Sequence, residues 1–137
     1  MESEQNLGTS LGTAPAGAAD YVRQVESMAQ ACPAQPLSEL AYGLDPAQRL
    51  DVYVPDRPRS DEGPLPVLIF FHGGAWVRGN RSWLKFMAPA VTSLPAIFVA
   101  GTYRLAPRGP GRGRSHNVPH LPPSRLSAVS RLGGGST

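Results

Sequence analysis

Acidic side chains are missing from the second half of the chain. All ten Asp and Glu residues of the 137-residue sequence lie at or before Glu62, together with four of the thirteen Lys and Arg residues. Residues 1–62 therefore carry a net charge of −6, whereas residues 63–137 carry nine basic residues and no acid, a net charge of +9. This asymmetry excludes a catalytic carboxylate downstream of Glu62. The overall charge of +3 hides the split and does not by itself predict a nucleic-acid partner.

Cysteine and long apolar runs are also scarce. Cys32 is the only cysteine, so no intrachain disulfide can form, which fits a reducing compartment. The first six residues are polar and acidic, and they lack the basic and apolar regions of a signal peptide. The longest strongly apolar run, residues 67–71, is far shorter than the roughly 20 residues of a membrane helix. We therefore expect a soluble, cytoplasmic protein with no membrane partner.

Three segments differ in composition. Residues 1–36 start rich in Gly, Ser, Thr and Ala, which predicts a flexible leader, and they end with a short helix at residues 21–31 capped by Asp20. Residues 37–107 carry the strand patterns and form the predicted domain. Residues 108–137 contain no acid and no Phe, Tyr or Trp, and their apolar residues are scattered. We expect this last segment to be a disordered, basic tail.

Strand patterns occur four times in the predicted domain. Residues 37–42 fit a weak strand, and residues 49–54 alternate polar and apolar side chains, which predicts a half-buried strand. Residues 67–71 and 96–100 are apolar at every position, as in a parallel-sheet strand that is covered on both faces. The spacing between these last two segments predicts one β-α-β crossover, so the fold class is α/β.

The two predicted helices have apolar stripes. The stripe of the first helix consists of Tyr21, Val25 and Met28. The crossover helix starts after Asn80 or Ser82 and runs to about Leu94, and Pro89 is expected to kink or shorten it. The stripe of the crossover helix consists of Trp83, Met87, Ala90, Val91 and Leu94.

Three short segments carry a family resemblance. Residues 72–76 read His-Gly-Gly-Ala-Trp directly after the third predicted strand, and residues 103–107 read Tyr-Arg-Leu-Ala-Pro after the fourth. Upstream, residues 49–55 read Arg-Leu-Asp-Val-Tyr-Val-Pro. In this order and at this spacing the segments resemble the α/β-hydrolase superfamily, in particular esterases, lipases and arylformamidases close to kynurenine formamidase and to feruloyl or acetyl esterases. The resemblance covers residues 37–107 and implies the N-terminal portion of the α/β-hydrolase fold, with about four strands and one crossover helix.

The resemblance assigns a role to the loop. In the family this loop forms part of the oxyanion hole, in which backbone N–H groups point at a developing negative charge. It implies that Gly73, Gly74 and Ala75 donate those N–H groups, and that His72 and Trp76 support the loop. Two consecutive glycines allow unusual backbone angles and keep side chains away from the substrate. Carboxyl ends of strands are also where ligands bind in open α/β sheets.

The family's catalytic residues have no counterpart in the sequence. The nucleophilic Ser of the family lies in Gly-x-Ser-x-Gly after the oxyanion loop, and an acid and a His follow it. No such motif follows Pro107, so we assign no nucleophile, acid or base and predict that the chain alone is inactive. The match at residues 8–12 precedes the loop and follows no strand, so we interpret Ser10 as a decoy. The full-length relative would hydrolyse small carboxylic esters or aryl formamides through an acyl-enzyme. Residue 102 is Thr, where the family often has Asp.

Two other classes of function stay open. The chain could be a non-catalytic fragment, either regulatory, dimerising or without function, with a chaperone or self-association through unpaired strands such as residues 96–100. A basic RNA-associating protein is the weaker alternative, because the Arg-Gly segment at residues 108–114 has no aromatic side chains for stacking. His116 and His120 have the spacing of a zinc helix, but Pro119 opposes a helix there and no carboxylate lies nearby. We therefore predict no metal and no cofactor.

The composition of residues 109–137 raises a question about their origin. Arg, Gly, Pro and Ser dominate the segment, and these are residues that GC-rich codons encode. We expect a frameshift, an alternative exon or a sequence error, with a natural basic tail as the alternative.

Overall fold

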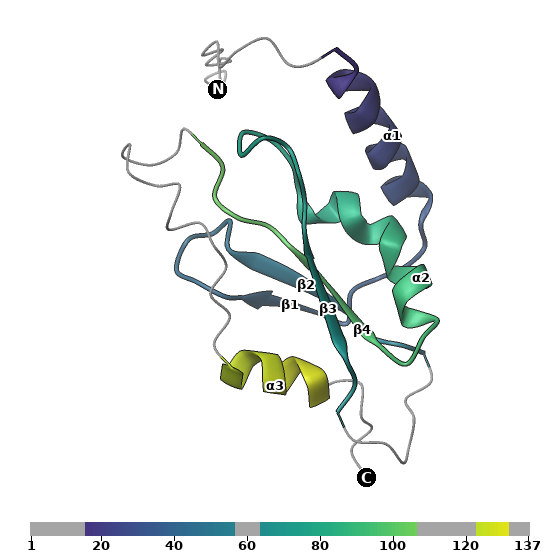
Figure 1. Ribbon diagram of the computed structural model, residues 1–137, viewed down its shortest axis with the longest axis vertical. Coiled ribbons are helices and arrows are strands. Elements are labelled where there is room, and N and C mark those ends of the chain that lie inside the picture. The colour runs from purple at the N-terminus through teal and green to yellow at the C-terminus, as the bar shows by residue number, and fades with distance from the viewer. Residues whose placement is uncertain (1–15, 57–63, 107–122, 132–137) are drawn as a thin grey trace, which may run out of the picture.

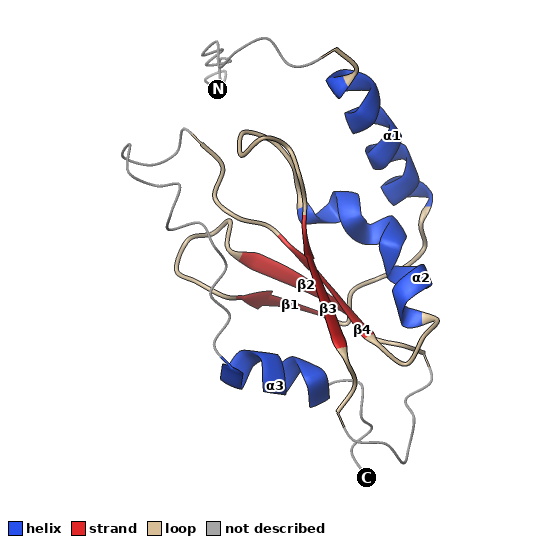
Figure 2. Ribbon diagram, in the orientation of Figure 1, coloured by secondary structure: helices blue, strands red, loops and turns tan. Residues whose placement is uncertain are grey.

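A single four-stranded sheet organises the part of the chain that the structure describes. The computed structural model describes residues 16–56, 64–106 and 123–131. Helices lie on both sides of the sheet (Figures 1 and 2). The elements in chain order are α1 (Ala18–Ala31), β1 (Ser38–Ala41), β2 (Arg49–Tyr53), β3 (Val67–Phe71), the 3-10 helix η1 (Arg81–Met87), α2 (Ala88–Thr92), β4 (Ile97–Gly101) and α3 (Pro123–Arg131).

The sheet has the strand order β1-β2-β4-β3. β1 pairs with β2, and β2 with β4, in antiparallel orientation, whereas β3 and β4 are parallel. Val67 lies opposite Ile97, and the register continues to Phe71 opposite Gly101. η1 and α2 connect the two parallel strands, so the predicted β-α-β crossover and the α/β class are confirmed. Each predicted strand lies within one residue of an observed strand at both ends.

β4 lies in the interior of the sheet. All five of its residues are buried, and it pairs with β2 on one edge and with β3 on the other. The prediction that residues 96–100 lack partners is therefore wrong. The prediction assumed that the partners of residues 96–100 would be strands that follow in the chain, but both partners of β4, β2 and β3, precede it.

Two hydrophobic clusters cover the two faces of the sheet. The first combines residues of β2 and β4 with Leu65 and with Val129 of α3, and the second combines the alternate residues of β2 and β4 with η1 and α2. β2 is consequently buried on both faces, and the half-buried strand predicted from its alternating pattern is wrong. The first cluster contains Leu50, Val52, Leu65, Ile97, Val99 and Val129. The second contains Tyr53, Leu84, Ala88, Phe98 and Ala100.

Pro89 divides the helical crossover. The predicted helix of residues 80–94 is a 3-10 helix followed by a short α-helix. Proline has no N–H group, so Pro89 cannot donate a hydrogen bond to the carbonyl of Lys85 four residues earlier. That carbonyl instead accepts hydrogen bonds from the N–H of Ala88 and from the thiol of Cys32, whose Sγ lies 3.5 Å away.

The face that the crossover buries agrees only in part with the prediction, because Met87 and Val91 of the predicted stripe pack against the second cluster, whereas other members do not. The side chain of Asn80 caps η1, as predicted, and accepts a hydrogen bond from the N–H of Ser82 at 3.1 Å. Leu84 and Ala88 are the buried residues of η1 and α2. A 3-10 helix has three residues per turn, so it turns a different set of side chains toward the sheet than an α-helix would. Two members of the predicted stripe are exposed: Ala90 and Leu94.

α1 begins earlier than predicted and buries a narrower stripe. It follows Gly17, which has a φ of 88°, and no side chain caps its first turn. Asp20 does not cap the helix but forms an ion pair with Arg23. Val25 and Ala29 are buried, and the helix packs against η1. Two members of the predicted stripe are exposed: Tyr21 and Met28.

Part of the predicted disordered tail is a helix. Residues 123–131 form α3, which packs under the sheet (Figure 2), and Val129 is buried in the first cluster. The N–H of Leu65 donates to the carbonyl of Ser130 at 3.3 Å. The expectation of disorder is wrong for this segment, which the buried Val129 and the hydrogen bonds between Leu65 and Ser130 attach to the rest of the structure. Pro123 at the first helical position is a signal that could have indicated the helix.

Candidate functional site

The loop after β3 makes a tight turn at residues 72–79. Gly74 and Gly79 have positive φ angles of 126° and 121°, and Ala75 and Trp76 lie in the left-handed region at 53° and 66°. The N–H groups of Val77 and Arg78 both donate to the carbonyl of Gly74 at 3.1 Å. A Cβ atom on Gly74 would overlap the carbonyl of Arg78, so only glycine fits there.

His72 is buried at the base of this loop. Its Nδ1 lies 2.7 Å from the carbonyl oxygen of Gly73. A carbonyl oxygen only accepts hydrogen bonds, so Nδ1 carries the proton and Nε2 is the bare nitrogen of the neutral ring. Nε2 is buried and has no hydrogen-bond partner among the described residues. Burial lowers the pKa of His72, and the bond to the Gly73 carbonyl offsets part of that effect.

Tyr103 holds the loop from the end of β4. Its ring stacks on the ring of His72 with a centroid distance of 4.6 Å, and its hydroxyl donates to the carbonyl of His72 at 2.9 Å. Burial raises the pKa of Tyr103, which keeps the hydroxyl protonated as a donor. Trp76 packs against Tyr103 at 5.3 Å, and the N–H of Ala106 donates to the carbonyl of Trp76 at 2.8 Å. The two sequence motifs are therefore in direct contact.

Thr102 connects β4 to the turn between β1 and β2. Its hydroxyl lies 2.7 Å from the carbonyl of Ala47 and 3.3 Å from the carbonyl of Arg49, and its own carbonyl accepts a hydrogen bond from Tyr42 at 2.6 Å. An ionised Asp has no hydrogen to donate and could not bond to these carbonyls. Burial, together with the charge of Asp45, raises the pKa of Tyr42 to about 12, so its hydroxyl also stays a donor.

Three consecutive amides of the loop have no acceptor within the described part of the chain. The N–H groups of Gly73, Gly74 and Ala75 donate to no other described residue. A Cβ atom on Gly73 would have no atom within 4 Å, so the space beside that residue is open. Unlike Gly74, Gly73 has no positive φ. Gly74 is therefore needed for its positive φ, whereas Gly73 leaves open space beside the loop.

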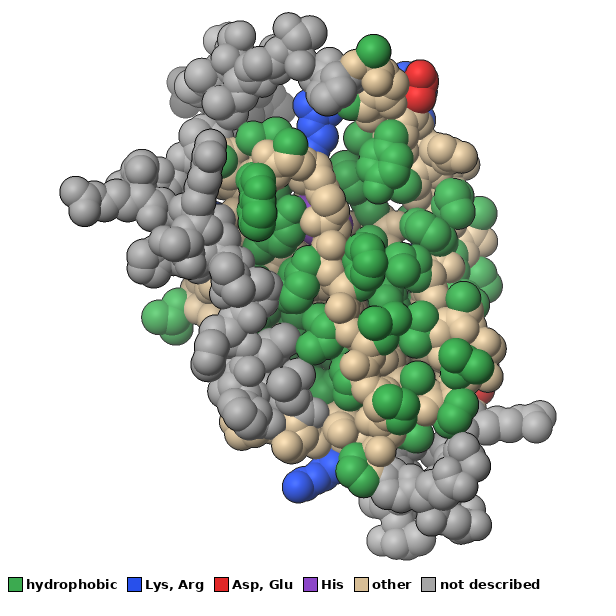
Figure 3. All heavy atoms as spheres, in the orientation of Figure 1, with side chains coloured by type: hydrophobic (Ala, Val, Ile, Leu, Met, Phe, Trp, Pro, Cys, Tyr) green, Lys and Arg blue, Asp and Glu red, His purple; other side chains and the backbone are tan. Residues whose placement is uncertain are grey.

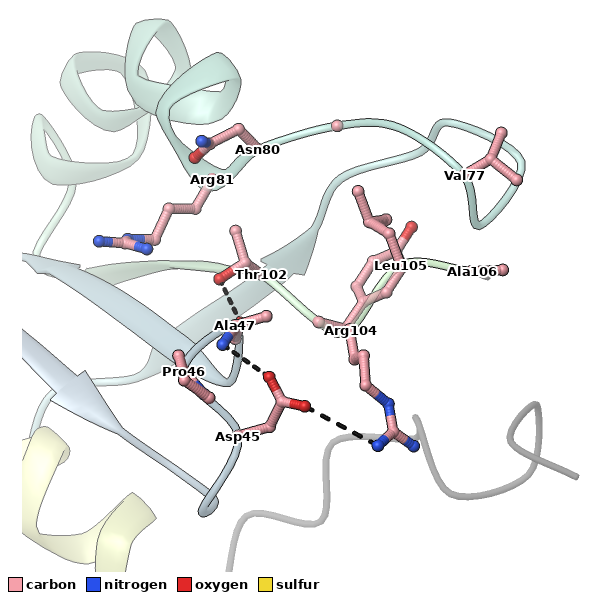
Figure 4. Close-up of a pocket in the computed structure, with 12 residues that line it drawn as sticks. Asp45, Pro46, Ala47, Val77, Asn80, Arg81, Thr102, Arg104, Leu105 and Ala106 are labelled. Atoms are coloured by element: carbon pink, nitrogen blue, oxygen red, sulfur yellow. Dashed lines mark hydrogen bonds and ion pairs between the residues drawn. The ribbon is translucent and has the colours of Figure 1, made fainter. Parts of the chain in front are cut away.

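A pocket of about 670 Å³ opens beside the loop (Figure 4). Val77 and Gly79 are the loop residues that line it, and the three amides are not part of its lining. Its polar side chains are already bonded within the protein. Asp45 accepts from the N–H of Ala47 at 2.9 Å and lies 3.8 Å from the guanidinium of Arg104.

Sequence reasoning missed a charged cluster beside this pocket. Arg81, at the start of η1, donates to the buried Asp51 of β2 at 2.7 Å and also pairs with Glu39 of β1. This cluster fixes the crossover to the first two strands. No sequence signal indicated it, because Asp51 looked like a solvent-facing residue of a half-buried strand.

The other predicted sites lie outside the described residues. They are Ser10 and its Gly-x-Ser-x-Gly match, the pair His116 and His120, and the Arg-Gly segment at residues 108–114. Among the residues that are described, no group of three or more His, Cys, Asp or Glu side chains could hold a metal ion. In that same part of the chain, no helix has the length and apolar character needed to cross a bilayer.

The sequence is similar to several hydrolases. No protein-family model matches the chain. It is 35% identical over 75 residues to a kynurenine formamidase of Danio rerio, which covers 55% of this chain and 25% of that protein. It is 33% identical over 70 residues to an isoprenylcysteine alpha-carbonyl methylesterase of Arabidopsis thaliana. That match covers 51% of this chain and 16% of that protein. Over 41 residues it is 56% identical to the esterase LipC of Mycobacterium tuberculosis, covering 30% and 10%.

Solved structures agree with the sequence comparison. A bacterial heroin esterase superposes with a TM-score of 0.52 at 29% identity, over 69% of this chain and 31% of that one. A candidate thioesterase of Silicibacter sp. superposes with a TM-score of 0.55 at 24% identity, over 72% and 37%. Over the part that it covers, the fold is that of the α/β-hydrolases. The α/β-hydrolase resemblance predicted from the sequence is confirmed.

The match to these α/β-hydrolases is partial in length. The chain spans a quarter or less of each of the three relatives described above. The activity and substrates of a whole α/β-hydrolase therefore enter below as proposals.

Proposed function

We propose that this chain supplies the oxyanion-stabilising loop of a hydrolase that acts on small carboxylic esters or aryl formamides. The observation that carries the proposal is the set of three neighbouring amides, those of Gly73, Gly74 and Ala75, which have no acceptor within the described residues. The names of the relatives, esterases and a formamidase, support the substrate class.

The geometry supports preorganisation of this loop. Gly74 keeps its unusual φ through the two hydrogen bonds to its carbonyl, and Tyr103 and His72 fix the start of the loop by stacking and hydrogen bonding. Donors that are held in place before the reaction stabilise a developing oxyanion more effectively than mobile ones, since they need not reorganise. His72 and Trp76 support the loop and touch no reacting atom in this proposal. No metal or cofactor takes part in it.

The proposed reaction needs a nucleophile, a base and an acid that the sequence does not offer in the family's order. We therefore expect the 137-residue chain to hydrolyse p-nitrophenyl acetate no faster than buffer does. A rate above that background that is abolished by Ser10→Ala would overturn the interpretation of Ser10 as a decoy. The cytoplasmic location and binding by a chaperone also remain predictions.

A chimera tests the role of the loop. Residues 107–137 are replaced by the corresponding C-terminal part of the Danio rerio kynurenine formamidase, and hydrolysis of p-nitrophenyl acetate and of an aryl formamide is measured. Gly74→Ala should lower kcat by about 10²–10³ with a small change in KM. The added methyl group would displace the Gly74 amide, which is proposed to stabilise the transition state more than it stabilises the bound substrate.

Gly73→Ala is the matched control in the same chimera. It adds the same methyl group one residue earlier, where no atom lies within 4 Å and the backbone need not move, so it should alter KM, through the space beside the loop, more than kcat. Equal losses of kcat in both variants, or a Gly74→Ala effect confined to KM, would contradict the proposal and favour a substrate-packing role. An inactive chimera that is folded by circular dichroism would favour the non-catalytic alternative.

A further inference from the structure

The carbonyl groups at the start of the loop after β3 are bonded to side chains of the protein. The carbonyl of His72 accepts a hydrogen bond from the hydroxyl of Tyr103 at 2.9 Å. The carbonyl of Gly73 accepts one from Nδ1 of His72, which lies 2.7 Å away. Each carbonyl shares a planar peptide group with the N–H of the following residue. The first bond therefore fixes the plane of the Gly73 N–H, and the second fixes the plane of the Gly74 N–H.

The third peptide group of the loop is held by backbone donors. The carbonyl of Gly74 accepts from the N–H groups of Val77 and Arg78, both at 3.1 Å, and it shares its peptide plane with the N–H of Ala75. The three amides of the proposed function therefore have one feature in common. The carbonyl of each peptide group is bonded within the described chain, whereas its N–H is not. A hydrogen bond to the carbonyl also polarises the peptide group and makes its N–H a stronger donor.

Tyr103 is the donor in this set that comes from another strand. β3 and β4 are parallel with Phe71 opposite Gly101, so the segments that follow the two strands leave the sheet side by side. The ring of Tyr103 contacts three other rings, at centroid distances of 4.6, 5.3 and 6.5 Å: those of His72, Trp76 and Phe71. Packing thus fixes the ring, and the hydroxyl can be removed while those ring contacts remain.

Water has little access to the contact between Tyr103 and His72. The two residues are 7% and 4% exposed. Figure 3 shows only a trace of the histidine colour between hydrophobic side chains on this face of the molecule. A hydrogen bond in such surroundings does not compete with water and is electrostatically stronger than one at the surface. The hydroxyl of Tyr103 can therefore act on the His72 carbonyl without interference from solvent.

We propose that Tyr103 is a positioning residue for the oxyanion-stabilising loop: its hydroxyl, through the carbonyl of His72, orients and polarises the peptide group that carries the Gly73 N–H. This role rests on the proposed function of the loop. Tyr103 touches no reacting atom, and its effect reaches the substrate only through the Gly73 amide. Because His72 and the backbone of the loop hold the other two peptide groups, loss of the hydroxyl should impair one donor of the three.

NMR relaxation of the full chain tests the effect of the hydroxyl on the loop. In Tyr103→Phe the order parameter of the Gly73 N–H should fall from about 0.85, which is typical of a rigid backbone, toward about 0.6. The physical reason is that the carbonyl of the same peptide group has lost its donor. This measurement does not depend on catalytic activity.

Tyr42→Phe is the matched control. It removes another tyrosine hydroxyl that donates to a backbone carbonyl, that of Thr102 at 2.6 Å, while the N–H of Thr102 keeps its bond to the carbonyl of Arg49. The order parameter of the Gly73 N–H should stay at the wild-type value in this variant. No decrease in Tyr103→Phe, or equal decreases in the two variants, would overturn the proposal.

Kinetics of the formamidase chimera described above separate a positioning role from a purely structural one. Tyr103→Phe should lower kcat about tenfold with KM nearly unchanged, which is the effect of about one hydrogen bond that serves the transition state. Tyr42→Phe should leave kcat unchanged, and equal losses in both variants would indicate a structural role. A loss of kcat in Gly74→Ala without one in Tyr103→Phe would overturn this proposal alone, whereas no loss in Gly74→Ala would overturn the proposed function itself.

Discussion

Ala75 and Trp76 are the two non-glycine residues with positive φ in the described part of the chain. A side chain in the left-handed region costs roughly 1–2 kcal/mol, because Cβ approaches the following carbonyl oxygen. The loop holds both residues there through the turn at Gly74 and the contact of Trp76 with Tyr103. Strain of this kind is concentrated at functional sites.

Relief of this strain is the first prediction. Ala75→Gly should raise the free energy of unfolding by about 1 kcal/mol, because glycine adopts a φ of 53° without penalty. Ala90→Gly is the control, since Ala90 is exposed within α2 and its replacement should lower stability by about 1 kcal/mol. Urea denaturation of the three proteins measures both changes. Equal destabilisation by both substitutions would show that Ala75 is not strained.

His72 makes stability depend on pH. Burial lowers its pKa in the folded protein below the ordinary value of about 6.5, which the unfolded chain retains. Below about pH 6.5 the unfolded chain therefore binds more protons at this site, and stability falls as the pH decreases toward the folded pKa. Above that pH the contribution is constant.

The expected result is a difference between wild type and His72→Asn. The urea midpoint of the wild type should drop more between pH 7.5 and 5.5 than that of the variant, because other groups titrate alike in both. An NMR titration of the His72 ring measures the same pKa directly and serves if the variant does not fold. A ring that titrates above pH 6.5 would contradict this account.

At the scale of elements, the guanidinium of Arg81 links η1 to two strands. Arg81 of η1 pairs with Asp51 of β2 and Glu39 of β1, and the Asp51 side chain is only 12% exposed. The carboxylate of Glu39 is largely solvated, so its pair with the cation is expected to contribute little. A buried carboxylate that loses its cation, by contrast, is strongly destabilising.

The two ion pairs should therefore differ in their effect on stability. Arg81→Met should lower the free energy of unfolding by about 3 kcal/mol, whereas Glu39→Gln should change it by less than about 1 kcal/mol. Adding Asp51→Asn to Arg81→Met should restore part of the loss, because the buried group is then neutral. Chemical denaturation of the four proteins gives these values, and no recovery in the double variant would show that Arg81 acts through packing alone.

At the scale of the whole molecule, the first hydrophobic cluster includes a residue of α3, close to the C-terminal end of the chain. Val129 of α3 is 2% exposed and belongs to the cluster that also contains side chains of β2 and β4. Val129→Ala should lower the free energy of unfolding by about 1.5–2.5 kcal/mol, from two lost methyl groups and the cavity they leave. Ser127→Ala, at an exposed position of the same helix, should change it by less than about 0.5 kcal/mol. If thermal or urea unfolding does not distinguish the two variants, α3 does not contribute to the folded core.

Local patterns in the sequence predicted the strands, the crossover and the position of the loop. The apolar run at residues 96–100 predicts a strand that is buried on both faces, and β4 is one. The run at residues 67–71 also forms a strand, but Leu68 and Phe70 on one of its faces are 45% and 42% exposed, so the prediction that both faces are covered is wrong there. Residues 72–76 and 103–107 are local motifs that can be recognised from the sequence alone. The split of the helix at Pro89 follows from a missing N–H group, which is also a local property.

Tertiary structure alone decided which strand lies inside the sheet, which face of each element is buried and which charges meet. The order β1-β2-β4-β3 places β4 at the centre and β3 at the edge, although β4 comes later in the chain. Asp51 is buried because η1 supplies Arg81, and Val129 is buried because an open apolar face lies beside it. These outcomes depend on contacts between residues about 30 to 80 positions apart, and no local pattern of side chains encodes such contacts.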